Sequence, residues 1–346
     1  MRLLLATLAA SLALVHPAAA QEAPKGAPSP NEIVAAAPTK DWVAIAPADL
    51  LVMTLAPDRD PGSGAAAGGN KRQVVIQLMP PPFSQGWVGN IRKLAAARWW
   101  DGLSINRVQD NYVVQWGDAD GEDKAKAKAL PSGLSQMAEA DYETKGQPPL
   151  MLDFLIARGA HRPGQEWIFE PQLKKADPYS DRVGIFQGWP IAMRSTAEDE
   201  DYARSWPVHC YGMVGVGRGF SPDTGSGAEL YTVIGHAPRH LDRNIALVGR
   251  VVEGIEHLSS LPRGTGALGF YEKPEQRVPI LSIRLASELP PAEQPKFQYL
   301  STESDSFAKY ADARANRRDP FFIVPAGGAD ICNIPVPVRR APAAGR

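Results

Sequence analysis

The chain has 346 residues, of which 37 are Lys or Arg and 38 are Asp or Glu, so its formal net charge at pH 7 is −1. The basic residues form no block or stripe, which argues against nucleic acid as the main partner. The length allows one large domain or two small ones.

Residues 1–20 have the pattern of an export signal. Arg2 precedes an apolar run over residues 3–15, and three alanines at 18–20 form a cleavage site before Gln21. The run is short for a transmembrane helix, so a retained membrane anchor is the less favoured alternative. The Ala- and Pro-rich start is typical of a bacterial protein. We therefore expect a periplasmic or secreted protein without stable membrane insertion.

The chain contains two cysteines, Cys210 and Cys332. In an oxidising compartment they could form a disulfide that ties the C-terminal tail to the core. Two separate buried thiols are the alternative, because a sequence does not show whether two cysteines are close in space.

The first third of the chain predicts a linker, then strands and one helix. Residues 21–45 are rich in Ala, Pro and Glu, which predicts a disordered linker. Strands are predicted at 49–55 and 72–79, on either side of a Gly- and Ala-rich loop. Apolar residues between 87 and 95 recur at helical spacing, which predicts a helix after the prolines at 80–82. Short strands follow around Arg107 and Val113.

The regular pattern loosens over residues 120–205, which we interpret as a large insertion with helical pieces near 150–157. Strands are predicted again at 209–216, 230–234, 244–252 and 279–286, with a short helix at 253–260. Residues 46–290 are thus interpreted as one domain. Residues 291–346 form a C-terminal extension with one helical candidate at 307–315. Many short strands without βαβ alternation predict a mainly β fold with an antiparallel barrel.

Several short motifs resemble the cyclophilin family of peptidyl-prolyl cis-trans isomerases in their order and spacing. The resemblance covers residues 50–286 apart from the insertion, and implies an eight-stranded antiparallel β-barrel capped by two helices. The motifs are Ile-Asn-Arg-Val at 105–108, Tyr112-Val113, Gln115, Trp-Gly-Asp at 116–118, Val-Gly-Arg at 216–218, Ala-Glu-Leu-Tyr-Thr at 228–232, His-Leu-Asp at 240–242 and Val-Gly-Arg-Val at 248–251.

The resemblance implies isomerisation of X-Pro bonds in proline-containing polypeptides, with Arg107 and Gln115 as catalytic residues. The substrate-binding residues that it implies are Tyr112, Val113, Gly217, Arg218, Glu229, Tyr231, His240 and Leu241. We expect no cofactor, and no metal site, because no cluster of His, Cys, Asp and Glu has the spacing of metal ligands. We also expect a monomer.

The chemistry explains why an arginine matters here. Twisting an amide costs about 18–20 kcal/mol, because resonance makes its C–N bond partly double, yet no bond has to break. The twisted amide has a free lone pair on the prolyl nitrogen. A permanently charged donor aimed at that lone pair binds the twisted form better than the planar form. Arg107 fits this role.

The chain departs from the family pattern at positions that bear on activity. The aromatic residue and the His that precede the family's arginine are absent, Glu229 replaces a glutamine, and His240 replaces a tryptophan. A further family His falls at Ile245. Glu229 could weaken the peptide contact or pair with Arg107. A catalytically weakened peptide-binding module or chaperone is therefore the alternative, although the retained arginine favours the enzyme.

Overall fold

The computed structural model describes residues 26–57, 72–146, 177–196 and 199–342. The expected export signal at 1–20 and the helical pieces expected near 150–157 lie outside the described residues. None of the helices in the described ranges is both long enough and apolar enough to cross a bilayer.

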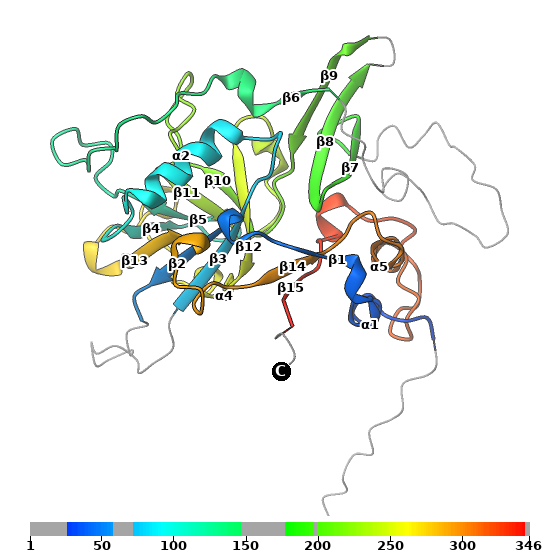
Figure 1. Ribbon diagram of the computed structural model, residues 1–346. Coiled ribbons are helices and arrows are strands. Elements are labelled where there is room, and N and C mark those ends of the chain that lie inside the picture. The colour runs from blue at the N-terminus through cyan, green and yellow to red at the C-terminus, as the bar shows by residue number, and fades with distance from the viewer. Residues whose placement is uncertain (1–25, 58–71, 147–176, 197–198, 343–346) are drawn as a thin grey trace, which may run out of the picture.

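Eight antiparallel strands close into a barrel (Figure 1). This confirms the predicted fold, and each of the eight strands overlaps a segment for which the sequence predicts one. In barrel order they are β10 (Met213–Val216), β11 (Leu230–Val233), β5 (Val113–Gly117), β4 (Ser104–Val108), β13 (Val278–Leu285), β2 (Leu50–Leu55), β3 (Arg72–Leu78) and β12 (Leu247–Glu253).

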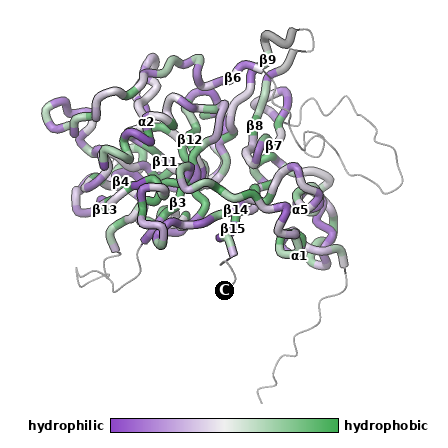
Figure 2. Tube along the Cα trace, in the orientation of Figure 1, coloured by the Kyte–Doolittle hydropathy of each residue, from purple (hydrophilic) through white to green (hydrophobic). Residues whose placement is uncertain are grey.

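Two helices cover the barrel, as expected. Helix α2 (Gln85–Ala96) packs against β12 and β13, and its apolar residues at helical spacing form the buried face. Helix α4 (Glu256–Ser259) is a single turn that packs against β3. Hydrophobic residues gather along barrel strands such as β3, whereas the outer loops carry the hydrophilic ones (Figure 2).

The described part of the insertion forms a second antiparallel sheet, which stands beside the barrel (Figure 1). Its strand order is β6 (Thr144–Lys145), β9 (Asp199–Pro207), β8 (Trp189–Thr196) and β7 (Arg182–Phe186). The sequence did not predict these strands. In β8 the residues from Trp189 to Met193 are all buried and include Pro190, so the alternation that identifies a half-exposed strand is missing.

The two ends of the described chain pack together. Strands β1 (Trp42–Ala44), β14 (Phe297–Leu300) and β15 (Val338–Arg340) form a sheet with β14 in the centre. Helix α1 (Pro30–Ala36) lies beside α5 (Asp305–Ala315), which confirms the predicted C-terminal helix (Figure 1).

The prediction of a disordered linker over 21–45 is therefore wrong for residues 30–44. Ser29 and Glu32 form a reciprocal capping box that starts α1. The partners that order this segment, α5 and β14, come more than 250 residues later, so composition alone does not reveal them.

Short 3₁₀ turns connect several of these elements. They are η1 (Thr39–Asp41), η2 (Pro47–Asp49), η3 (Glu139–Tyr142), η5 (Arg239–Leu241), η6 (Ala267–Gly269), η7 (Pro274–Gln276), η8 (Ala286–Glu288) and η9 (Ile331–Asn333).

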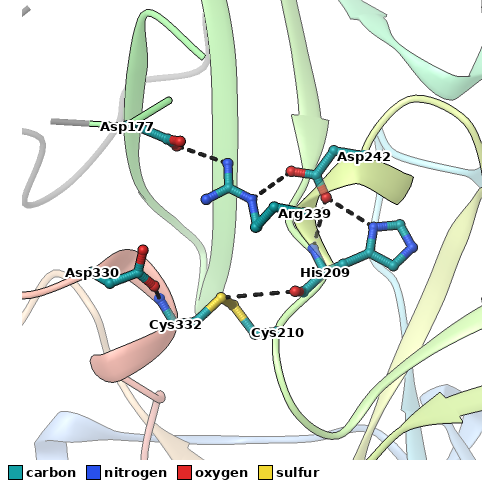
Figure 3. The surroundings of a disulfide bond; sticks show 7 residues. All are labelled: Asp177, His209, Cys210, Arg239, Asp242, Asp330 and Cys332. Carbon is teal, nitrogen blue, oxygen red and sulfur yellow. Dashed lines mark hydrogen bonds and ion pairs between the residues drawn. A yellow bond between two sulfur atoms is a disulfide. The ribbon is translucent and has the colours of Figure 1, made fainter. Parts of the chain in front are cut away.

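Cys210 and Cys332 form a disulfide (Figure 3). It joins the segment before β10 to η9 across a sequence separation of 122 residues. Of the two alternatives that the sequence left open, the structure has the covalent tie between the C-terminal extension and the barrel domain.

Candidate active site

Three predicted site residues lie in a row across neighbouring barrel strands. Arg107 on β4 stands opposite Gln115 on β5, and Gln115 stands opposite Tyr231 on β11. Directly opposed residues in antiparallel strands point to the same face of the sheet. The neighbours of Gln115 along β5, Val114 and Trp116, point the other way into the main core. The row therefore lies on the outer face of the barrel.

The Arg107 guanidinium is held by neutral groups. Its Nη1 donates to Gln115 Oε1 at 3.1 Å, its Nε donates to the Leu268 carbonyl at 2.7 Å, and its Nη2 donates to Gln109 Oε1. The rings of Tyr112 and Phe270 lie 5.9 and 5.4 Å from the guanidinium carbon. Within the described residues Arg107 has no ion pair, so its charge is not neutralised by a carboxylate.

Partial burial shifts the pKa values of Arg107 and Tyr112. Burial lowers the pKa of Arg107, against the opposing influence of Tyr112, and burial raises the pKa of Tyr112. A guanidinium remains protonated in proteins, so Arg107 keeps its charge.

An apolar cluster lies beside the arginine. Its buried members are Val113, Tyr231 and Val233, and Tyr112, Leu241 and Ile245 pack against them. The ring of His240 stacks on Tyr112 with centroids 6.3 Å apart, and His240 itself is exposed. The structure thus brings the predicted substrate-binding residues Tyr112, Val113, Tyr231 and Leu241 together, with His240 at their edge.

Glu229 lies at the other side of Gln115 and is mostly buried. Its Oε1 accepts a hydrogen bond from the Asp118 backbone N–H at 2.6 Å. The Glu229 carboxylate can lie this close to the backbone only with glycine at position 117, because a Cβ there would lie 2.0 Å from Glu229 Oε1. The pair with Arg107 that the sequence left open does not form among the described residues.

Burial raises the pKa of Glu229 to about 7 from its ordinary value of 4.5, and the Asp118 carboxylate acts in the same direction. Hydrogen bonds from the Asp118 backbone and from Gln115 oppose the shift. Near pH 7 the side chain is therefore partly protonated, and the protonated form is closer in chemistry to the glutamine that the family pattern has at this position.

The raised pKa predicts a stability that depends on pH. Between pH 4.5 and 7 the folded chain holds the Glu229 proton more tightly than the unfolded chain, so the free energy of unfolding falls as the pH rises. Between pH 5 and 8 Glu229 accounts for a loss of about 2 kcal/mol. Urea unfolding at the two pH values measures this effect. Between them, we expect the free energy of unfolding of Glu229→Gln to fall by about 2 kcal/mol less than that of the wild type.

The exposed Glu256 serves as a matched control, and Glu256→Gln is expected to keep the wild-type pH dependence. If Glu229→Gln and wild type lost the same free energy of unfolding between pH 5 and 8, the buried carboxyl would not titrate as described.

The segment with the predicted substrate-binding residues Gly217 and Arg218 follows β10. The Gly217 N–H donates to the Glu229 carbonyl at 2.8 Å and so belongs to the barrel. Arg218 Nε donates to the Asn244 carbonyl at 2.9 Å, which links this segment to the loop after Leu241. Other backbone groups of 217–218 would therefore have to make the predicted contact.

Several residues around Arg107 and Tyr231 were not predicted. Gln109 lies two positions after Arg107, and strand periodicity could have placed it on the same face. Leu268 and Phe270 come from the loop after α4, about 160 residues away, where the sequence gives no signal. His209, which contacts Tyr231, begins the segment 209–216, for which the sequence predicts only a strand. In the described ranges, no group of three His, Cys, Asp or Glu side chains could hold a metal ion.

Comparisons with known proteins agree with the barrel fold. The model of the family described as cyclophilin type peptidyl-prolyl cis-trans isomerase/CLD matches residues 73–285. A crystal structure of a cyclophilin from Hirschia baltica matches with a TM-score of 0.59 and 18% identity, over 89% of this chain and 96% of that one. At this identity the match shows the fold.

Two crystal structures of a cyclophilin type peptidyl-prolyl cis-trans isomerase from Cryptosporidium parvum also match, one of them determined with the dipeptide Ala-Pro. They have 8% and 10% identity and TM-scores of 0.33 and 0.35. They cover 68% of this chain and 98% and 97% of their own. No curated protein sequence matches the chain.

Proposed function

The chain belongs to the cyclophilin-type peptidyl-prolyl cis-trans isomerase family, and we propose that it assists the folding of exported proteins by twisting X-Pro amides with the help of Arg107. The observation that carries the mechanism is a guanidinium held in place by neutral partners beside an apolar cluster.

Two N–H donors of Arg107 have no partner among the described residues and are proposed to face the substrate. A guanidinium has five N–H donors, and the bonds to Gln115, Gln109 and Leu268 use three of them. The remaining two belong to Nη1 and Nη2. A donor aimed at the prolyl nitrogen interacts more strongly once the amide twists and its lone pair is free. Only such a difference between the two forms of the substrate accelerates the reaction.

Gln115 acts on the arginine. Its Oε1 accepts from Arg107 Nη1, and the two residues are directly opposed on β4 and β5. A preorganised donor does not have to reorient when the amide twists, so orienting Arg107 is itself a contribution to catalysis. The apolar cluster gives the proline ring a dry surface, which fixes the amide relative to Arg107.

The export role rests on two independent features. Residues 1–20 have the composition of an export signal. Cys210 and Cys332 are paired, and disulfides persist mainly in oxidising compartments such as the periplasm or the extracellular space. Proline-containing polypeptides passing through that compartment are the proposed substrates.

An isomerisation assay with a short Ala-Pro peptide tests the proposal. We expect the protein to accelerate cis-trans exchange in proportion to its concentration, as measured by protease coupling or NMR exchange. Saturable peptide binding without acceleration would instead indicate a binding module or chaperone. The ionisable Glu229 and the exposed His240, which stand where the family has glutamine and tryptophan, favour that second function.

A further inference from the structure

A buried hydrogen-bonded chain runs from the apolar cluster into the protein. The Tyr231 hydroxyl lies 2.8 Å from His209 Nε2, and His209 Nδ1 lies 2.9 Å from Asp242 Oδ1. The side chains of His209 and Asp242 are 0% and 3% exposed, and Tyr231 is 4% exposed. Polar groups that are buried this completely are costly unless they are paired, so each bond constrains its partners.

The directions of these bonds follow from the charges. Burial alone would raise the pKa of Asp242, but the hydrogen bonds from His209 and Arg239 and the charge of Arg239 lower it overall. The ionised Asp242 accepts a hydrogen bond from His209 Nδ1, and also one from the His209 backbone N–H at 3.0 Å. In a neutral imidazole the other nitrogen is then an acceptor. Burial keeps the pKa of Tyr231 well above its ordinary value, so its hydroxyl is available to donate to His209 Nε2.

Asp242 is itself anchored. Arg239 Nε donates to Asp242 Oδ2 at 2.6 Å, and Arg239 Nη2 donates to Asp177 of the insertion at 2.7 Å (Figure 3). The residue after His209 is Cys210, whose disulfide to Cys332 lies beside this group of side chains (Figure 3). Asp242, which holds the imidazole, is therefore tied to the insertion through Arg239, and the backbone next to His209 is tied to the C-terminal extension through the disulfide.

The backbone of β10 leaves room for the tyrosine. Gly215 stands opposite Tyr231, and a Cβ at position 215 would lie 2.3 Å from the Tyr231 hydroxyl oxygen. Real Cβ atoms essentially never come this close to another heavy atom. The Tyr231 ring can therefore lie across β10 toward His209 only because residue 215 has no side chain.

We propose that His209 and Asp242 are positioning residues for the isomerase. They hold the Tyr231 hydroxyl and thereby fix the position of the Tyr231 ring in the apolar cluster that contacts the proline ring. The proposal rests on the proposed function, since it assigns Tyr231 to the substrate surface. Neither residue touches the reacting amide. Both act through Tyr231.

This role predicts an effect on substrate affinity more than on turnover. The apolar cluster contacts the proline ring in the planar and the twisted forms alike, so a displaced Tyr231 ring weakens both to a similar extent. Uniform loss of binding raises KM and leaves kcat nearly unchanged. Loss of Arg107 has the opposite signature, because Arg107 favours the twisted form.

A double-mutant cycle in the full-length protein tests the inference. His209→Asn retains a donor for Asp242 but is too short to reach Tyr231, and we expect it to raise KM about tenfold with kcat within about twofold. Tyr231→Phe removes the hydroxyl and is expected to have the same effect. The double variant should be no worse than either single variant. His209→Gln, which reaches further, should restore part of the affinity.

The matched control is His236→Gln, an exposed histidine in the neighbouring loop, for which KM should stay at the wild-type value. Additive effects of His209→Asn and Tyr231→Phe on KM, or a fall in kcat with KM unchanged, would overturn the inference. If His209→Asn does not fold, the KM of Tyr231→Phe is the test, and a KM equal to that of the wild type would overturn the inference. A wild-type protein without isomerase activity would contradict the proposed function. An active wild-type protein with additive effects of the two substitutions would contradict only the role of His209 and Asp242.

Discussion

Replacing Arg107 by alanine is expected to lower kcat/KM for an Ala-Pro peptide by about 10²–10³-fold, the loss seen when one preorganised donor is removed from an enzyme site. The proposed reason is that Arg107, which forms no ion pair with any described residue, places its charge at the edge of the apolar cluster. Protease-coupled kinetics at several peptide concentrations measure the effect, and most of it should appear in kcat.

Two variants separate the charge from its geometry. Arg107→Lys keeps the charge but loses the fork of donors that bonds Gln115 and Gln109, so we expect it to remain well below wild type. Arg92→Ala removes an arginine from the outer face of α2, where it pairs with Asp49, and should leave kcat/KM unchanged. Wild-type activity of Arg107→Ala would remove Arg107 from the proposed role.

Reducing the Cys210–Cys332 disulfide is expected to lower the free energy of unfolding by about 2–5 kcal/mol. The bond closes a loop with a sequence separation of 122 residues, and a long loop has much conformational entropy in the unfolded chain. Urea unfolding of the wild type with and without a reductant measures the loss.

The variant Cys332→Ser provides the control for this experiment. It should unfold at the urea concentration of the reduced wild type, and the reductant should have no further effect on it. A wild-type unfolding midpoint that does not move on reduction would show that the C-terminal extension contributes its contacts without the covalent tie.

The barrel could be predicted from the sequence because its strands carry local signals. In β2 and β3, β-branched and aliphatic residues mark each strand, and turn-forming residues bound them. The same reasoning failed for residues 30–44 and for β7 to β9. There the order comes from distant partners, such as α5 for α1, or from strands that are buried without alternation, such as β8.

The site likewise contains residues that could be predicted from the sequence and residues that could not. Arg107, Tyr112, Gln115 and Tyr231 could be named because they stand in motifs with a fixed order, and the pairing of β4, β5 and β11 brings three of them into one row. Leu268 and Phe270 could not be named, because a loop remote in sequence places them against Arg107. The His209 contact depends on the absence of a side chain at Gly215, which only the strand register reveals.

Glu229 shows what a sequence leaves undecided even when the position is recognised. An acidic residue in place of glutamine could have paired with Arg107. The structure instead directs its carboxylate to the Asp118 backbone, and burial rather than an ion pair determines its titration. Within the described part of the chain, Arg107 therefore forms no ion pair with Glu229.

The most direct measurement of the central claim is the rate of cis-trans exchange on the enzyme, obtained by NMR with a saturating Ala-Pro peptide for wild type and Arg107→Ala. We predict that both proteins bind the cis and trans peptides with similar dissociation constants, and that exchange on the bound peptide slows by about 10²–10³-fold in Arg107→Ala. Equal exchange rates in the two proteins at saturation would contradict the account, because Arg107 would then not stabilise the twisted amide.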